Sequence, residues 1–337
     1  MKITIKDIAR LAGVSTTTVS KVINNKDESI SQATRERITS LMKEYNYTPS
    51  TVARSLVTKK TNTIGLIIPD IRNPFFPELA RGVEDRANSA GYNIIFCNTD
   101  NKIDKEDEYL RILAEKMVDG IIMAPSSKRE DRLDKTKNYF VPVILVDRDI
   151  DIETDYVKGR VFTDNFKGAH DAVKYMINQG LRRILFISGP LTSKASIERL
   201  EGYKSALKES NIEYEAGCVL EGEFNETWGR EAAIAAVDNK IEFDGIFCGN
   251  DLIAIGAVKS LKEKGLSVPK DISVVGFDDI YVSRLIEPEL TTVRQPKYEM
   301  GFEAVEMLLK ILEGKRVSET RLVLQPELII RDSVRQA

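Results

Sequence analysis

Short polar side chains in the segment AGVSTTTVSKVIN, residues 12–24, have the types and spacing needed to recognise another molecule. Its apolar residues recur at helical spacing and are Val19, Val22 and Ile23. Its opposite face carries Thr17, Ser20, Lys21 and Asn24. Threonine is a mediocre helix former, because its branched side chain loses rotamer freedom against the preceding turn. The pattern predicts a short helix that displays hydroxyls, an amide and one cation to something outside the fold.

A second set of polar residues follows long apolar runs in the larger part of the chain. These residues are Asp70 after GLIIP, Asp147 and Arg148 after VILV, Asn250 after IFCG, and Asp278 after VVGF. Ligands of open parallel sheets lie at the carboxyl ends of the strands. Carboxylates, amides and guanidinium groups hydrogen-bond vicinal hydroxyls, and aromatic rings pack on C–H surfaces, so the set is typical of a sugar site.

Several of these positions have a purely structural interpretation as well. Asn73 and Pro74 form a helix start, in which Asn73 caps the first turn. Phe75 and Phe76 suit a hydrophobic core, and Asp251 suits the cap of the helix that follows it. The joint occurrence of the polar residues at strand ends favours a binding site over these separate explanations.

The elements that position the first set are three short helices within residues 1–47. Thr4 and Asp7 resemble a capping box, Gly13 breaks the first helix, and Ser15 and Ser31 suit the N-caps of the second and third. Ile5, Ile8, Ala9 and Ala12 are expected to face inward, as are Ile38, Leu41, Met42 and Tyr45. A helix, a tight turn with glycine and a second helix form a helix-turn-helix, which places its second helix in the major groove of DNA.

From Thr61 onward, apolar strands alternate with helices in two successive series. This pattern predicts parallel sheets covered on both faces, and therefore an α/β body of two lobes. We expect a first lobe over about residues 61–160 and 292–321, and a second over about 161–291 and 322–337. Residues 48–60 are expected to form a linker that contains a short hinge helix.

Composition agrees with a globular protein that binds nucleic acid through its N-terminal segment. The 337 residues are 42% hydrophobic and 30% charged, and the net charge is −3. Residues 1–60 hold 11 Lys and Arg against 5 Asp and Glu, which leaves the remainder acidic. A basic segment on an acidic body predicts a polyanionic partner for that segment alone.

The sequence gives little support for an enzyme, a metalloprotein or a membrane protein. It contains no phosphate-binding glycine loop and no nucleophile elbow, and its single histidine is His170. Its three cysteines, Cys97, Cys218 and Cys248, lack metal-ligand spacing and are expected to be reduced. No apolar run is long enough to span a membrane and no signal peptide opens the sequence, so we expect a cytoplasmic protein without cofactor or metal.

The motifs resemble, in order and over the whole chain, the lactose-repressor/galactose-repressor family of transcriptional regulators. They are TIKDIARLAGVSTTTVSKVIN, SQATRERI, YNYTPSTVARSL, IPDIRNPFFPELARGVED and GFDDI followed by PELTTVRQP. The resemblance implies a helix-turn-helix head, a hinge helix and a body like a periplasmic sugar-binding protein. It also implies a homodimer on a near-palindromic double-stranded operator. No heptad pattern follows LIIRDSVRQA, so a coiled-coil tetramer is not expected.

The resemblance also implies roles in DNA binding for individual residues. Thr16, Thr17 and Lys21 match positions that contact base edges, with Ser20 on the same face. Lys6, Ser15, Asn24 and Asn25 match phosphate contacts, which position the protein without specifying sequence. Leu56 matches a leucine that wedges into the minor groove, where unstacking a base step creates a favourable bend.

The ligand pattern is similar to that of ribose-binding members. The matching residues are Asn73, Phe75, Phe76, Asp147, Arg148, Arg199, Phe224, Asn250, Asp278 and Gln295. Ala124 departs from the pattern, since ribose-binding members carry a polar amide there, and the exact sugar stays open. Purine-binding members carry an arginine shortly after the GPL turn, whereas this chain has Thr192, Ser193 and Lys194.

The main hypothesis is a repressor induced by ribose or a related pentose. One alternative is a catabolite-control regulator whose corepressor is a phosphocarrier protein, bound near Arg81 and the helix at residues 298–309. Others are a regulator with a different sugar or a purine effector, a sugar-binding transport protein, and a sugar enzyme. For the transport protein, the DNA-binding head stands where an export signal would be required.

Overall fold

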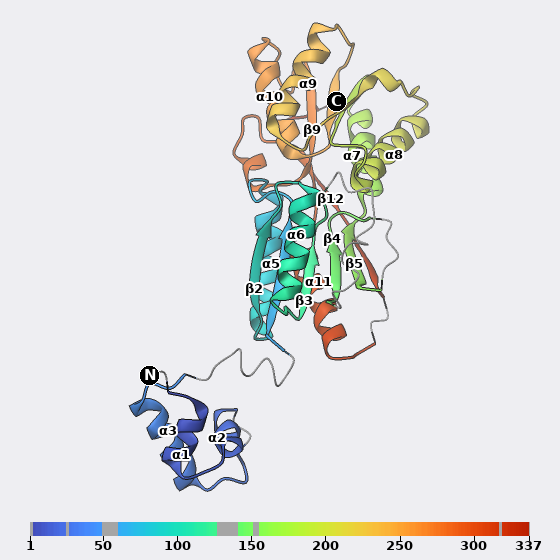
Figure 1. Ribbon diagram of the computed structural model, residues 1–337. Helices are drawn as coiled ribbons and strands as arrows, with labels where there is room; N and C mark the ends of the chain where they lie inside the picture. The colour runs from blue at the N-terminus through green and yellow to red at the C-terminus, as the bar shows by residue number, and fades with distance from the viewer. Residues whose placement is uncertain are drawn as a thin grey trace. The chain divides into compact units, whose positions relative to one another are not determined.

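The computed structural model describes residues 3–24, 27–48, 60–126, 141–150, 155–316 and 319–336. The chain divides into two compact units, residues 1–61, here called the head, and residues 62–337, here called the body. Figure 1 shows the helices of the head and the two sheets of the body. None of the helices in the described part has the length and apolar character that crossing a bilayer requires.

The head contains three helices, and the caps predicted for them are present. They are α1 (Ile5–Ala12), α2 (Thr16–Ile23) and α3 (Gln32–Glu44). The Thr4 amide donates to an Asp7 carboxylate oxygen at 3.0 Å, and Gly13, with φ of 65°, ends α1 in a left-handed conformation. Side-chain oxygens of Ser15 and Ser31 accept from amides three residues on.

The core of the head follows the apolar stripes with one exception. It consists of Ile8, Ala9, Ala12, Val19, Val22 and Ile38, with Leu41 and Met42 packed against it. The prediction for Tyr45 was wrong, because its side chain is exposed and Tyr47 packs on the core instead. The helix ends at Glu44 and Asn46 takes a positive φ of 47°, which turns the chain so that Tyr47 points inward.

The first lobe of the body is a parallel sheet with helices on both faces (Figure 1). Its strands are β1 (Thr63–Ile68), β2 (Asn93–Asn98), β3 (Gly120–Met123), β4 (Val143–Val146), β5 (Val157–Thr163) and β11 (Arg321–Leu324), in the order β11-β5-β4-β3-β1-β2. Its helices are α5 (Phe75–Ser89), α6 (Ile103–Glu115) and α11 (Lys297–Leu312). Side chains of α5 and α11 share one apolar cluster with the sheet, and those of α6 pack in another.

The second lobe repeats this architecture with one antiparallel edge strand. Its strands are β6 (Ile184–Ser188), β7 (Val219–Glu221), β8 (Gly245–Cys248), β9 (Ser273–Asp278), β10 (Thr291–Arg294) and β12 (Glu327–Ile329), in the order β12-β10-β9-β8-β6-β7. Its α-helices are α7 (Asn165–Asn178), α8 (Lys194–Glu209), α9 (Glu226–Asp238) and α10 (Asp251–Glu263). Short 3-10 helices are η2 (Ala216–Cys218) and η3 (Tyr281–Arg284).

Glycine allows the helices on one face of the first sheet to approach each other closely. A Cβ atom on Gly82 of α5 would lie 2.0 Å from the Tyr298 carbonyl oxygen, and one on Gly301 of α11 would lie 2.1 Å from that of Leu79. A side chain at either position would force the two backbones apart. The pair α5 and α11 therefore packs as one rigid layer beneath the sheet.

The chain passes between the lobes three times, at residues 164, 295–296 and 325–326, between elements that belong to different sheets. These crossings lie a few residues later than the borders predicted from the sequence. Each of β5, β10 and β11 runs to its carboxyl end before the chain leaves the sheet. As a result β10 belongs to the second lobe and β11 to the first, which reverses the assignment expected for them.

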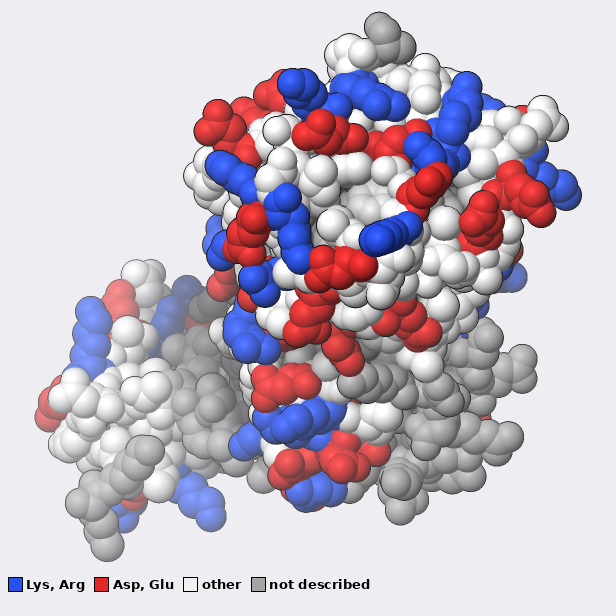
Figure 2. All heavy atoms as spheres, turned by 90° about the horizontal axis from the view of Figure 1, so that it is seen from above, with Lys and Arg blue, Asp and Glu red and all other residues white. Residues whose placement is uncertain are grey.

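The surface of the body is mixed in charge. On the face shown in Figure 2, blue Lys and Arg side chains lie between red Asp and Glu side chains rather than in a patch of one sign. Exposed ion pairs occur on the body, such as Arg230 with Glu263 at 2.7 Å. This face is typical of a solvated surface.

Candidate functional site

Three of the residues predicted to contact base edges are exposed on one face of the head. Thr16, Thr17 and Lys21 are exposed on α2, and Val19 and Val22 on the other side of the helix are buried. Thr17 and Lys21 are one helical turn apart, so a hydroxyl and an ammonium group project in the same direction. The arrangement can offer hydrogen-bond donors and a methyl group to base edges in a groove.

The flanking residues serve the helix and also remain accessible. The hydroxyl of Thr18 lies 2.9 Å from that of Ser15, so the third threonine belongs to the cap and not to the exposed face. Asn24 Nδ2 donates to the Ser20 carbonyl oxygen at 2.8 Å and lies 3.3 Å from its hydroxyl. Lys6, Ser15 and Asn24 are exposed. Asn25, Leu56 and the hinge lie outside the described residues.

A cleft between the two lobes brings together most of the residues predicted to bind ligand. Its lining is Asn73, Phe75, Phe76, Asp147, Arg148, Ala195, Arg199, Phe224, Asn250 and Asp278. The carboxyl ends of β1 and β4 supply the first-lobe residues, and those of β7, β8 and β9, with α8, supply the others. The remaining space is about 20 Å³, close to the size of one water molecule, because the side chains fill the cleft.

Four buried charges form the centre of this cleft. Asp147 and Arg148 come from the first lobe and lie 3.5 Å apart between Oδ2 and Nε. Arg199 comes from the second lobe, where its Nε donates to Asn165 at 3.0 Å and its Nη1 donates to the Gly249 carbonyl oxygen at 2.6 Å. Asp278 accepts a hydrogen bond of 2.7 Å from Gln295 Nε2. When both carboxyl groups are ionised, the set balances two carboxylates against two guanidinium groups, which suits an uncharged ligand.

Aromatic rings complete the walls beside the guanidinium groups. The Arg148 Cζ atom lies 5.9 Å from the centre of the Phe76 ring and 5.4 Å from that of Phe224. Arg199 stacks closely on Phe277, with its Cζ atom 3.8 Å from the ring centre. Cation–π contact holds a guanidinium plane in place while its N–H groups stay available to hydroxyl oxygens.

Burial changes the proton affinity of both carboxyl groups. Desolvation raises the pKa of Asp278 to about 7, although the nearby Arg199 guanidinium acts in the opposite direction. Desolvation likewise raises the pKa of Asp147, against the attraction of Arg148 and Arg199. Groups perturbed in this way inside a cleft are typical of binding sites.

The backbone at two strand ends is held in unusual conformations. Asp147 has a φ of 62° and Asp278 a φ of 120°, values that residues other than glycine rarely adopt. Asp147 directly follows the buried strand β4, and Asp278 is the last residue of the buried strand β9, so these strands fix the direction of the chain. Such strain concentrates at ligand sites, and here it directs both carboxylates toward the cleft.

Two residues of the predicted ligand set are absent from the lining. Asp70 instead forms an ion pair with Arg72 at 2.9 Å, and this pairing lowers the pKa of its carboxyl group. Gln295 is buried behind Asp278 and orients that carboxylate. Asn73 and Asn250 line the cleft and also accept hydrogen bonds from Phe75 and Ile253 amides, so the structural interpretation of Asn73 holds beside the functional one.

The structure adds positions that sequence reasoning missed. Ala195 lines the cleft, and Asn165 holds Arg199 across 34 residues of sequence. Lys297, at the start of α11, is buried and donates to the carbonyl oxygens of Asp278 at 2.6 Å and Asp279 at 3.0 Å. A buried lysine one residue after a proline was the only local signal for this contact.

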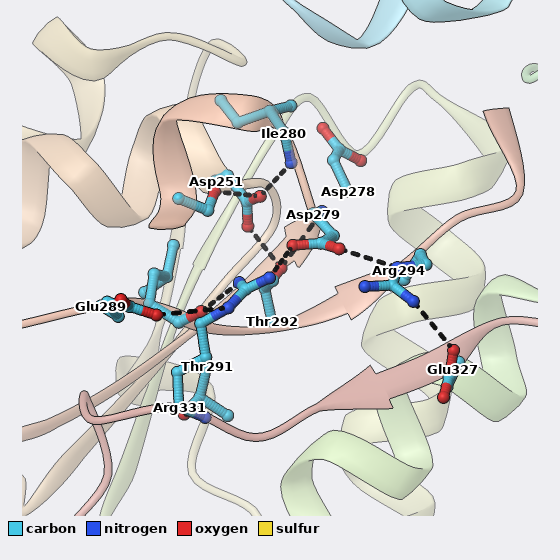
Figure 3. Close-up of polar contacts among 12 residues, drawn as sticks. Asp251, Asp278, Asp279, Ile280, Glu289, Thr291, Thr292, Arg294, Glu327 and Arg331 are labelled. Atoms are coloured by element: carbon cyan, nitrogen blue, oxygen red, sulfur yellow. Dashed lines mark hydrogen bonds and ion pairs between the residues drawn. The ribbon is translucent and has the colours of Figure 1, made fainter. Parts of the chain in front are cut away.

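Ionic and hydroxyl contacts fix the segment after β9, as Figure 3 shows. Asp279 pairs with Arg331 at 2.5 Å and with Arg294 at 2.8 Å, and Arg294 continues to Glu327 at 3.2 Å. Beneath them Asp251, fully buried, accepts from the Ile280 amide and from the hydroxyls of Ser283 and Thr292. Asp251 therefore holds the loop after Asp278 through hydrogen bonds. The expectation that it caps α10 was wrong, because the N-cap of that helix is Asn250.

The polar groups of the cleft can bind a ligand from both lobes. In the described part of the chain no three His, Cys, Asp or Glu side chains are grouped as a metal site would require. His170 lies on α7, where its ring pairs with Asp171 and Glu209 on the surface. The cleft offers hydrogen-bond acceptors and donors from opposite lobes, so a ligand can bridge them.

Both parts of the chain match known protein families. Residues 61–331 match the family of periplasmic binding proteins and the sugar-binding domain of the LacI family, and residues 4–50 match the bacterial regulatory proteins of the lacI family. The transcriptional regulator RegA of Clostridium saccharobutylicum is 40% identical over 337 residues, covering 99% of each chain. The transcriptional repressor PurR of Vibrio atlanticus (strain LGP32) is 38% identical over 337 residues, covering 98% of each.

Solved structures show the same arrangement. The lac repressor dimer bound to operator and the anti-inducer ONPF superposes with a TM-score of 0.85 at 25% identity, over 99% of both chains. A LacI family regulator from Enterococcus faecium with bound ribose gives a TM-score of 0.72 at 30% identity, over 82% of this chain and 99% of the other. The chain therefore belongs to the LacI family, as a DNA-binding transcriptional repressor with a ligand-binding body and not an enzyme.

Proposed function

We propose that this repressor binds a near-palindromic operator as a homodimer and is released by a small sugar, ribose or a related pentose, acting as inducer. The observation that carries the proposal is the balanced set of buried charges supplied by both lobes. Asp147 and Arg148 face Arg199 and Asp278 across one cleft, with Phe76 and Phe224 beside them. A neutral polyol can hydrogen-bond all four, whereas an ion would leave two of them repelled.

On the DNA side, we assign the base edges to Thr16, Thr17, Ser20 and Lys21. Lys6, Ser15, Asn24 and Asn25 are assigned to phosphates. For Leu56 we keep the minor-groove wedge that the family resemblance implies. Exposure of Lys6, Ser15, Thr16, Thr17, Lys21 and Asn24 supports the assignment, and Ser20 is half-buried on the same helix.

The two sites communicate through lobe closure. Because the cleft is lined from both lobes, a ligand that bonds Arg148 and Asp278 together favours one relative position of the lobes. The hinge segments then pair or separate according to that position. A coupling of about 1–3 kcal/mol is sufficient for induction when the ligand binds the DNA-free state better.

The test is a calorimetric titration of the full chain with ribose, other pentoses, hexoses, hypoxanthine and guanine, joined to operator binding at fixed salt. We expect one pentose to bind and to weaken operator binding. Arg148→Ala should reduce its affinity at least about thirtyfold, because the substitution leaves Asp147 without its buried partner. Arg111→Ala, which breaks an exposed pair with Glu115, is the matched control and should bind normally.

Three results would contradict the proposal. A sugar that strengthens operator binding would make the ligand a corepressor. Unchanged affinity of Arg148→Ala would remove Arg148 from the site. Binding of hypoxanthine or guanine alone would favour a second candidate function, a purine-responsive repressor. The similarity to repressors named PurR supports this candidate. Against that candidate, residues 192–194 lack the arginine that the resemblance leads us to expect in purine-binding members.

The phosphocarrier alternative has less surface available than the sequence suggested. Arg81 forms ion pairs with Glu84 at 3.3 Å and with Asp85 at 2.9 Å. Much of α11 is buried against the first sheet and α5. A partner at this place would have to bind the few exposed positions of α11 and displace the pairs of Arg81.

A further inference from the structure

Glu106, in the first turn of α6, is a buried carboxylate outside the effector cleft. Its side chain is fully buried and shares the inner face of the helix with Leu110 and Leu113. An acidic residue interacts favourably with the helix dipole in a first turn, but it can do so from the surface, as the exposed Asp104 does. An apolar side chain would fill the inner position without the cost of burying a charge. The carboxylate therefore indicates a specific polar partner.

The partner of Glu106 is the loop after β3. Its Oε2 atom accepts a hydrogen bond of 2.7 Å from the Ser126 amide. The Ser126 hydroxyl in turn donates to the Asn101 carbonyl oxygen at 3.0 Å and lies 3.1 Å from Asn101 Oδ1. Asn101 has a φ of 58°, and its own amide donates to the Pro69 carbonyl oxygen at 2.9 Å. These hydrogen bonds join the loops that follow β2 and β3, with Glu106 at their buried end.

The joined loops supply hydrogen-bond acceptors to Arg148, the guanidinium group that the first lobe places in the cleft. Arg148 Nη1 donates to the Pro125 carbonyl oxygen at 3.2 Å and to Asn101 Oδ1 at 3.4 Å. Burial lowers the pKa of Arg148, and the charges of Asp147 and Glu106 act against that change. Glu106 is not among the described residues that line the cleft, so it acts on the site only through other groups.

We propose that Glu106 is a positioning residue of the effector site, which holds the loop after β3 through the Ser126 amide and thereby fixes the Arg148 guanidinium for binding. The inference rests on the proposed function, because it takes Arg148 to contact the effector. It adds that Arg148 is ordered before the ligand arrives. Less conformational entropy of this long side chain is then lost on binding, which strengthens the affinity.

The test is a calorimetric titration of the full chain with ribose, xylose, arabinose and glucose. For the sugar that binds, Glu106→Met should weaken affinity about tenfold or more, because the Ser126 amide loses its acceptor. Glu106→Gln should keep affinity within about threefold of the original, since its amide oxygen can accept the same hydrogen bond. Glu108→Met, which changes an exposed carboxylate of the same helix, is the matched control and should bind normally.

A double-mutant cycle distinguishes positioning of Arg148 from general support of the fold. When Arg148 is already alanine, Glu106→Met should weaken affinity by no more than about twofold, because the group through which it acts is gone. A loss of the same size with and without the Arg148 side chain would overturn the inference. Failure of Glu106→Gln to keep affinity would also overturn it, and both results would leave the proposed function standing.

A second measurement needs no ligand. In NMR spectra of the arginine side chains of the full chain, the Nε–Hε signal of Arg148 is identified by its loss in Arg148→Ala. This signal should shift or broaden in Glu106→Met and stay unchanged in Glu108→Met. If Glu106→Met does not fold, Ser126→Ala, which removes the hydroxyl link to Asn101, takes its place in both measurements. An unchanged Arg148 signal would overturn the inference, whereas absence of binding by every sugar would reject the proposed function alone.

Discussion

The carboxyl group of Asp278 is the most informative single group in the cleft. It stands within a cluster that also holds Asp147, Arg148 and Arg199, and burial raises its pKa to about 7. Near neutral pH the group is therefore partly protonated. A hydroxyl that donates to Asp278 stabilises its charged form and lowers its pKa, so ligand binding and proton release are linked.

Effector binding is accordingly expected to release protons near pH 7, and affinity should rise as the pH increases from about 6 to 8. Calorimetry in buffers of different ionisation enthalpy measures the proton release directly. Asp278→Asn should remove most of it. Proton uptake, or a pH dependence that survives this substitution, would contradict this role.

The free energy of unfolding of the unliganded protein should change with pH in the opposite direction to ligand affinity. The native pKa of Asp278 lies above the ordinary aspartate value of 3.8, so the native state binds this proton more tightly than the unfolded chain does. Its contribution to the free energy of unfolding is then greatest below about pH 4 and falls as the pH rises toward 7. The same carboxyl group thus favours ligand binding at a pH where it disfavours the empty fold.

At the scale of elements, the start of α11 connects the two lobes. Lys297 is buried, belongs to a helix of the first lobe, and donates to two carbonyl oxygens at the end of β9 in the second. Its ammonium group also lies 3.4 Å from Glu78 on α5. One side chain therefore ties the strand end that carries Asp278 to the layer formed by α5 and α11.

Lys297→Met is expected to lower the free energy of unfolding by about 1–3 kcal/mol, because two buried carbonyl groups lose their donor. It should also weaken effector binding, since Asp278 loses its support. Denaturant unfolding and calorimetry on the same preparation measure the two effects. Lys310→Met, which removes an exposed pair with Glu306 on the same helix, should change neither. A Lys297→Met protein of normal stability and affinity would show that this connection is dispensable.

Local signals in the sequence were enough for the elements and for most of the cleft. The caps Thr4, Ser15 and Ser31 and the strand ends at Asp147 and Asp278 follow from residue types and periodicity over short windows. Contacts between distant segments were not accessible in this way. Asn165 with Arg199, and Asp279 with Arg331, are 34 and 52 residues apart, and nothing local marks one as the partner of the other. Asp70 differs from these cases, because its partner Arg72 is only two residues away and the pair was open to local reasoning.

At the scale of the whole molecule, the division of charge separates the two functions. The N-terminal segment is basic and the rest of the chain is acidic. The face of the body in Figure 2 carries both positive and negative side chains. Nonspecific attraction to DNA therefore depends on the head. Under the proposed function the body contributes through a neutral ligand, which changes operator affinity without adding charge.

Operator affinity is expected to fall steeply as the salt concentration rises. The slope of log affinity against log salt concentration should become shallower by about one when Lys6 is replaced, because one phosphate contact is lost. Lys6→Ala should weaken all DNA sequences alike, whereas Lys21→Ala should also relax the preference at one base pair. Fluorescence anisotropy over a salt series measures both. Lys262→Ala in the body serves as the control, and a slope change of equal size there would contradict the assignment of the phosphate contacts to the head.

The three passages of the chain between the lobes have a consequence for synthesis on the ribosome. The edge strands β11 and β12 come from residues 321–329, yet they belong to different sheets. Nascent chains that have emerged only to about residue 320 lack an outer strand in both halves of the body. Neither half of the body can be complete until residues 321–329 have emerged from the ribosome, so ligand binding can begin only after that point.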